Sequence, residues 1–123
     1  MPGVLTHLTA GFILFFVGKF YFKDYFKKNP NDLFLLGAVC LMFSILPDIF
    51  LGLYYTTHIL SFDTLKVYHN LVHFVFSPIA VILLIIPIFW KGLYKRPIWI
   101  MGLIAIGLHI LMDLFIQEHG ILF

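Results

Sequence analysis

The chain has 123 residues, of which 62% are hydrophobic, 19% aromatic and 11% charged, and its formal net charge is +2. Because a soluble domain carries about 25% charged residues, this chain has too few polar side chains for a water-facing surface, and we exclude a soluble enzyme. The small net charge excludes nucleic acid as a partner, and the single cysteine, Cys40, excludes a disulfide scaffold. The composition predicts one domain, residues 1–123, embedded in a lipid bilayer.

Four apolar stretches follow one another along the chain, each close to the roughly 20 residues that a helix needs to cross the hydrocarbon core. They are Val4–Phe22, Leu33–Leu53, Val67–Trp90 and Pro97–Ile116. The first has no basic residue before it and no small-residue cleavage site after it, so we expect a span and not a signal peptide. The predicted fold class is an all-α bundle of four transmembrane helices.

Basic residues predict the orientation of this bundle in the cell membrane. They gather in two of the three connections between spans, at Lys23, Lys27, Lys28, Lys91, Lys95 and Arg96. The third connection, Tyr54–Lys66, carries only Lys66, which Asp63 balances. By the positive-inside rule, the two basic connections face the cytoplasm. Both termini and the third connection are therefore predicted to be non-cytoplasmic.

Ionisable residues inside a span need a reason, because an Asp at mid-helix costs about 2.5–3.5 kcal/mol on insertion scales. The four spans contain six such residues, which are His7, Asp48, His69, His73, His109 and Asp113. In the predicted topology all six fall in the outward half of the bundle, although the chain reverses direction between spans. His69 could instead lie at the membrane interface.

Helical spacing predicts that these residues face inward. Positions 4, 7 or 11 residues apart share one helix face, which gives one stripe per span: His7, Gly11 and Gly18; Gly37, Ser44 and Asp48; His69, His73, Phe76 and Ala80; Gly102, His109 and Asp113. Each stripe has polar groups toward the outside and mostly small residues below them, which allow membrane helices to approach closely. The pattern predicts a polar pocket at the outer end of the bundle interior.

The pocket has the composition of a metal site, because imidazole and carboxylate groups suit Zn²⁺ and related ions. The i, i+4 pairs His69–His73 and His109–Asp113 can each present two donors to one ion. Six candidates exceed the ligands of one zinc ion, so two ions, or one ion with a second shell, both fit. His58 and His119 have weaker claims, as solvated residues. Pro47 is either a plain kink or a device that frees a carbonyl in the pocket.

The ordered motifs resemble a known family. An early His, then "LPDIF", "YHNLVHF" and "HILMDLFIQEHG", are similar to the small membrane-bound predicted metal-dependent hydrolases, the family with a LexA-regulated inner-membrane member. The resemblance implicates His7, Asp48, His73, His109 and Asp113, with Gly120 as the distal glycine. The H-x-x-x-D helix is also similar to that of zinc-dependent phospholipase C, an all-helical enzyme group that hydrolyses phosphodiesters.

The chain departs from this family at three positions. Phe50 stands where a second acidic residue often follows Pro-Asp-x, and Asn70 and Phe74 stand near the helix that commonly carries an Arg and a Ser. An Arg that could clamp a phosphate is therefore missing, and metal binding is better supported than catalysis.

The first hypothesis is a zinc-dependent hydrolase with an outward-opening site, acting on a phospholipid or another phosphoester. His109, Asp113 and His73 are the preferred ligands, His7 completes the shell or binds a second ion, and Asp48 is a ligand or the general base. One alternative is a haem-binding electron carrier, although haem gives no use to the two Asp residues. Another is a metal carrier or sensor without catalysis, which would need a polar path to the cytoplasmic side.

Overall fold

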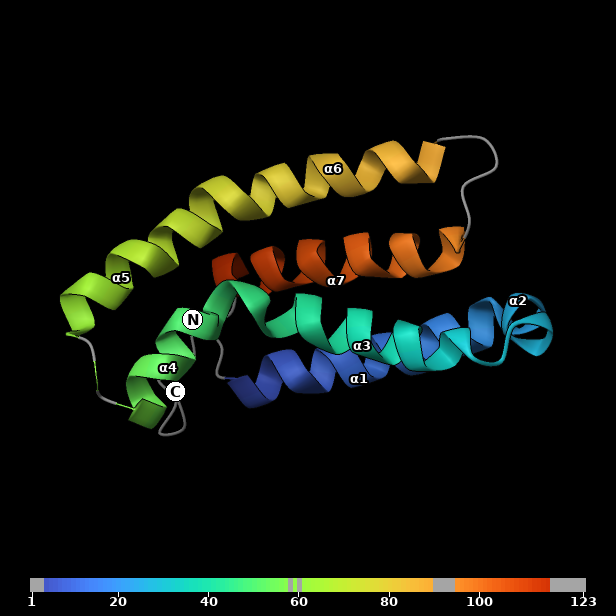
Figure 1. Ribbon diagram of the computed structural model, residues 1–123, viewed down its shortest axis with the longest axis horizontal. Helices are drawn as coiled ribbons and strands as arrows, with labels where there is room; N and C mark the ends of the chain where they lie inside the picture. Colours follow the sequence, from blue (N-terminus) through green and yellow to red (C-terminus); the bar gives the residue numbers. More distant parts are fainter. Residues whose placement is uncertain (1–3, 58, 60, 90–94, 116–123) are drawn as a thin grey trace.

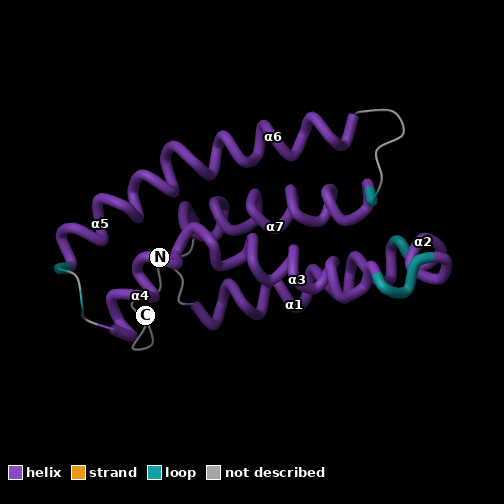
Figure 2. The backbone as a smooth tube through the Cα atoms, viewed as in Figure 1, coloured by secondary structure: helices purple, strands orange, loops and turns teal. Residues whose placement is uncertain are grey.

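The computed structural model describes residues 4–57, 59, 61–89 and 95–115. All regular structure in these ranges is helical, as Figure 2 shows, which confirms the predicted all-α class. In chain order the elements are α1 (Val4–Tyr21), α2 (Lys23–Lys28), α3 (Asp32–Ile45), the 3₁₀ turn η1 (Leu46–Asp48), α4 (Ile49–Thr57), α5 (Phe62–Leu71), the π-helical turn η2 (Val72–Phe76), α6 (Ser77–Phe89) and α7 (Arg96–Phe115).

Helix α7 packs against three of the other long helices, which are α1, α3 and α6. Helices α5 and α6 continue through η2 as one long curved rod, in which α6 lies along α7 and α5 extends beyond it toward α4 (Figure 1). Helix α1 lies along α3. Helix α1 begins at the same end of the molecule where α7 ends (Figure 1). Residues from opposite ends of the sequence therefore lie together there.

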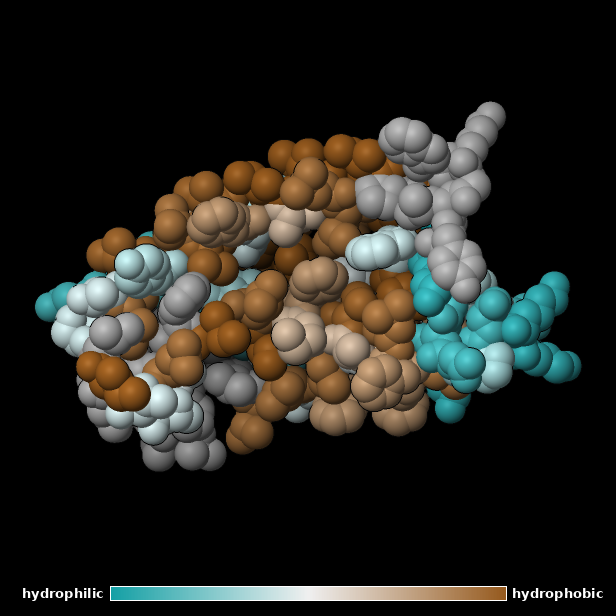
Figure 3. Space-filling view, in the orientation of Figure 1, coloured by the Kyte–Doolittle hydropathy of each residue, from teal (hydrophilic) through white to brown (hydrophobic). Residues whose placement is uncertain are grey.

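Within the described residues, two continuous helical runs are long and apolar enough to cross a membrane. They are Phe62–Ile86 and Arg96–Phe115, and Leu5–Tyr21 is a shorter apolar helix. Hydrophobic side chains cover the middle of the face seen in Figure 3, whereas hydrophilic ones gather at the α2 end and, in a smaller group, at the end with α4 and α5. This distribution is the one a chain embedded in hydrocarbon requires.

The second apolar stretch is not one straight helix. Helix α3 ends at Ile45, the chain tightens into η1, and α4 then leaves in a different direction (Figure 1). Pro47 explains the break, because it has no N–H to donate and its ring clashes with the preceding helical turn. The sequence indicated a kink at Pro47, and the structure has the break there, with Asp48 at it.

The third apolar stretch contains a wide turn. The hydroxyl of Ser77 donates to the carbonyl of Val72 at 2.9 Å, and Pro78, which lacks an N–H, follows directly. A π-helical turn accommodates one extra residue, so the inward position moves from Phe76 to Ser77. Phe76 is accordingly 54% exposed and Ser77 3% exposed. The prediction that Phe76 lines the interior was wrong.

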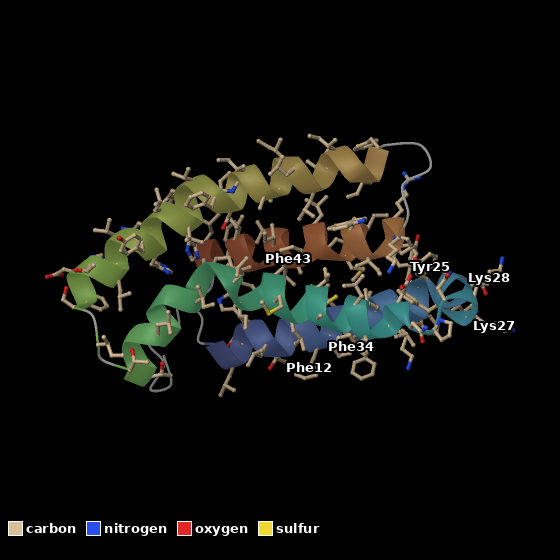
Figure 4. The ribbon with its side chains drawn as sticks, in the orientation of Figure 1. Phe12, Tyr25, Lys27, Lys28, Phe34 and Phe43 are labelled. Atoms are coloured by element: carbon tan, nitrogen blue, oxygen red, sulfur yellow. The ribbon has the colours of Figure 1, made fainter. Side chains whose placement is uncertain are left out.

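Small residues bring the helices close together, as the stripes predicted. A Cβ added to Gly11 would lie 2.9 Å from the Ser44 Oγ atom, and one added to Gly102 would lie 3.0 Å from the Phe43 ring. Figure 4 shows Phe43 on α3, on the side toward α7. Beneath these contacts the core is apolar, with Leu14, Leu36, Cys40, Ile98, Met101 and Ala105 buried.

The α2 end of the molecule is held by one carboxylate. The Tyr25 hydroxyl donates to Asp32 Oδ2 at 2.7 Å, and the Lys95 ammonium lies 3.0 Å from Asp32 Oδ1. The Tyr25 hydrogen bond, followed by the Lys95 ammonium, lowers the pKa of Asp32 below its ordinary value of 3.8. Tyr25, Lys27 and Lys28 are labelled at this end in Figure 4. The group ties the start of α3 to the residue before α7.

Candidate metal centre

Five elements bring the six predicted residues together at the opposite end from α2. His7 comes from α1, Asp48 from η1, His69 from α5 and His73 from η2, while α7 supplies His109 and Asp113. We call these six residues the His/Asp cluster. Three of its imidazoles are almost fully buried, at 1–2% exposed for the whole residue, and Asp48 is 8% exposed. The cluster is therefore largely shielded from solvent.

The carboxylate of Asp113 contacts three of the imidazole rings. Its Oδ2 atom lies 2.6 Å from His73 Nε2 and 3.1 Å from His109 Nε2. Its Oδ1 atom lies 3.4 Å from His7 Nε2. One carboxylate from α7 thus contacts α1 and η2 at once, as well as the histidine one turn before it.

Asp48 divides its two oxygens between two pairs of histidines. The Oδ2 atom lies 3.2 Å from His7 Nε2 and 3.8 Å from His109 Nε2. The Oδ1 atom lies 3.5 Å from His69 Nδ1 and 3.7 Å from His73 Nε2. The break at Pro47 places this carboxylate between the two sets of rings.

Backbone hydrogen bonds orient two of the rings. His109 Nδ1 lies 2.6 Å from the Ser44 carbonyl oxygen, and His73 Nδ1 lies 3.3 Å from the carbonyl oxygen of His69. Because a carbonyl only accepts, the Nδ1 atom carries the proton in both rings. The Nε2 atom of each neutral ring then presents a lone pair to the cluster. This is the tautomer that a histidine bound to a metal through Nε2 adopts.

When both rings are neutral in this tautomer, acceptors face acceptors within the cluster. The two Nε2 atoms of His73 and His109 are 3.2 Å apart, and both approach Asp113 Oδ2. Such atoms repel one another unless protons or a metal ion lie between them. Among the described residues, both ring nitrogens of His7 and His69 and the Oδ1 atoms of both carboxylates also lack a hydrogen-bond partner.

The spacing of these atoms suits a metal ion. Zn–N and Zn–O bonds of about 2.0–2.1 Å in a tetrahedron put neighbouring ligand atoms about 3.4 Å apart. The four contacts of His7 and His109 with the two carboxylates run from 3.1 to 3.8 Å. His7, Asp48, His109 and Asp113 form one possible ligand set, and Asp48, His69 and His73 form another. A buried His/Asp group able to hold a metal ion is therefore present.

His69 belongs to the cluster, since it is 2% exposed and its ring packs 4.1 Å from that of His73. His58, His119 and Gly120 lie outside the described residues. Asn70 and Phe74, which stand near positions where the resembled family carries Arg and Ser, are exposed.

Sequence reasoning missed the part played by the Ser44 backbone. Ser44 was expected only as a small residue of the inward stripe, yet its carbonyl orients His109. The available signal was Pro47, which was read as a possible means of freeing a carbonyl. In a regular helix, the residue at position 47 would donate its N–H to the carbonyl of Phe43, and a proline cannot do so. The carbonyl that contacts His109 is that of the next residue, Ser44.

Comparisons with known proteins do not identify a family. No family model matches the sequence. No curated protein and no solved structure matches it either.

Proposed function

We propose that this chain is a membrane-embedded, zinc-dependent hydrolase whose centre is the His/Asp cluster, acting on a phospholipid or another phosphoester. The observation that carries the proposal is the pair of oriented rings. His109 and His73 are held with Nδ1 on a backbone carbonyl and Nε2 on Asp113. A cation among these acceptors satisfies atoms that otherwise repel one another.

The chain's own residues would bind the ion and shape the reaction. When bound, zinc lowers the pKa of its water to about 7 and polarises the scissile group. His109 and Asp113, one helical turn apart on α7, would supply two ligands. His7 and Asp48 are the further candidates, because a catalytic zinc ion takes three protein ligands and keeps one position for water. Asp48 is proposed as a ligand, because its Oδ2 atom already lies 3.2 Å from His7 Nε2. The apolar residues around the site exclude water and strengthen these interactions.

We further propose that the bundle spans the cell membrane four times with both termini non-cytoplasmic. The spans would be α1, α3 with η1 and α4, the α5–η2–α6 rod, and α7. The basic end around α2 would then face the cytoplasm, as the positive-inside rule requires. The His/Asp cluster would lie in the outer half of the membrane, within reach of lipids of the outer leaflet.

The two alternatives receive less support. His7 and His109 stack with ring centroids 4.0 Å apart, whereas axial haem ligands face each other across a macrocycle. A metal carrier needs a polar path beyond the cluster, but Leu14, Cys40, Met101 and Ala105 fill the core that adjoins it.

Zinc content and hydrolysis of a chromogenic phosphodiester, measured together on the detergent-purified full chain, test the proposal. We expect zinc and activity in the wild-type protein, and loss of both in Asp48→Asn if Asp48 is a ligand. Loss of activity with zinc retained would instead make Asp48 the general base, at a typical cost of about 10²–10⁴ in rate. Full zinc occupancy in the triple variant His73→Ala, His109→Ala, Asp113→Ala would end the proposal.

Cysteine labelling tests the topology separately. Ser61 and Lys27 are both exposed, whereas the native Cys40 is buried and gives little background. In intact cells, a membrane-impermeant thiol reagent should label Ser61→Cys and leave Lys27→Cys unlabelled. The reverse pattern would overturn the orientation and leave the cluster unaffected.

A further inference from the structure

We propose that the His/Asp cluster is a two-ion centre in which Asp48 bridges the ions through its two oxygens. This inference rests on the proposed metal-dependent function and adds a second ion position to it. The first position is formed by His7, His109, Asp113 and the Oδ2 atom of Asp48. The second is formed by His69, His73 and the Oδ1 atom of Asp48.

The second position is marked by a histidine whose ring nitrogens make no hydrogen bond to the described residues. His69 is 2% exposed, and among the described residues neither of its ring nitrogens has a hydrogen-bond partner. Burying a polar ring without a hydrogen bond costs about 1–3 kcal/mol in proteins. Its Nδ1 atom points at Asp48 Oδ1 from 3.5 Å. An ion between these two atoms would satisfy both.

The same distance argues against a supporting role for His69 in the shell outside the ligands. A histidine that supports a metal ligand donates a hydrogen bond to it, at about 2.7–3.2 Å between heavy atoms. The separation of 3.5 Å from Asp48 Oδ1 is too long for that bond, as is the 3.7 Å from His73 Nε2 to the same oxygen. Both distances are close to the separation of about 3.4 Å expected between two ligand atoms of one tetrahedral zinc ion.

The bridge follows from the way Asp48 is held. Its Oδ2 atom faces the His7 and His109 side, and its Oδ1 atom faces the His69 and His73 side. His73 Nε2 also lies 2.6 Å from Asp113 Oδ2, so filling the second position replaces that hydrogen bond with a bond to the ion. Two ions about 3.5–4 Å apart stabilise the attacking and leaving oxygens of a phosphoester.

Metal stoichiometry and spin coupling test the bridge on the purified full chain in detergent. Loading with Zn²⁺ should give two ions per chain in the wild-type protein and one in His69→Ala. Asn70→Ala, an exposed neighbour of His69, is the matched control and should keep two. After loading with Mn²⁺, electron paramagnetic resonance should show a coupled pair in the wild-type protein and an isolated ion in His69→Ala.

Each other outcome has a defined meaning. One ion in the wild-type protein, unchanged in His69→Ala, overturns the two-ion centre and leaves the proposed function standing. Two ions without spin coupling overturn the bridge by Asp48. No bound ion at all overturns the proposed function as well. If His69→Ala does not fold, the stoichiometry and spectrum of the wild-type protein decide.

Discussion

The two ends of this molecule hold buried carboxylates in opposite ways. At the α2 end, Asp32 receives a hydrogen bond from Tyr25 on one oxygen and an ammonium group from Lys95 on the other. At the other end, Asp48 and Asp113 meet four imidazoles, and their Oδ1 atoms lack a hydrogen-bond partner among the described residues. Asp32 has a donor on each oxygen, whereas the cluster needs protons or a metal ion between its facing acceptors.

The difference separates a structural ion pair from a candidate site. Asp32 has one donor for each oxygen, so both oxygens take part in the connection between two helices. In the His/Asp cluster, His73 and His109 have Nδ1 on a backbone carbonyl and Nε2 close to the Asp113 carboxylate. Burial of a carboxylate alone therefore does not indicate a site, whereas burial among further metal-binding atoms marks a candidate site.

The largest expected effect separates the two carboxylate environments directly. Asp113→Asn should remove zinc and hydrolysis, because the amide presents one acceptor where two oxygens face three imidazoles. We expect a loss of zinc affinity greater than the roughly 10–100-fold that loss of a supporting hydrogen bond costs. Asp32→Asn is the matched control, and competition with a chelator measures both. Equal losses in the two variants would contradict the comparison.

A smaller effect is expected at Pro47. Pro47→Ala restores the N–H that pairs with the Phe43 carbonyl and allows α3 to continue. In a continued helix the Asp48 N–H would bond to the Ser44 carbonyl and draw it away from His109 Nδ1. Zinc affinity should fall by about 10–100-fold while the chain stays folded. Isothermal titration with Zn²⁺ measures the change. Unchanged affinity would show that this carbonyl does not orient the ligand.

Two glycines of α1 compare the rigidity of the two ends. A Cβ at Gly11 would meet Ser44 Oγ at 2.9 Å and the Cys40 carbonyl oxygen at 3.1 Å, whereas the three atoms nearest to one at Gly18 all belong to the side chain of Met101. Since methionine adapts easily, Gly11→Ala should cost about 1–3 kcal/mol of stability and Gly18→Ala less. Thermal unfolding in detergent measures both. A larger loss of stability in Gly18→Ala than in Gly11→Ala would show that the packing around Gly18 is the more rigid.

The smallest expected effect is a pH dependence at the α2 end. Because the folded-state pKa of Asp32 lies below 3.8, its contribution to stability is fully present above that value and is lost as the pH falls through the lower folded-state pKa. Melting temperatures between pH 6 and pH 3 should therefore fall less steeply in Asp32→Asn than in the wild-type protein. Parallel curves of melting temperature against pH would show that Asp32 contributes nothing to the pH dependence of stability.

The sequence was informative where residues are costly in an apolar chain. Four histidines and two aspartates stand out within hydrophobic runs, and helical spacing alone placed His109 with Asp113 and His69 with His73. The all-helical class followed from the same runs. These inferences need only composition and a helical period, which do not depend on tertiary contacts.

The sequence could not give the local departures from helical geometry. A regular period predicts Phe76 inside, and only the wide turn before Ser77 moves it out. Pro47 signals a break in the second stretch, but not the direction that α4 takes after it. Which nitrogen of His109 faces the carboxylates also depends on the Ser44 carbonyl of another helix. No spacing rule locates that contact.

The central claim is that imidazole and carboxylate groups of the His/Asp cluster hold a zinc ion. X-ray absorption at the zinc edge of the purified full chain tests it most directly. The account predicts a first shell of nitrogen and oxygen at about 2.0–2.1 Å, with the outer-shell scattering of imidazole rings. Sulfur at about 2.3 Å, which Cys40 would supply, or a shell of oxygen without imidazole scattering, would contradict it.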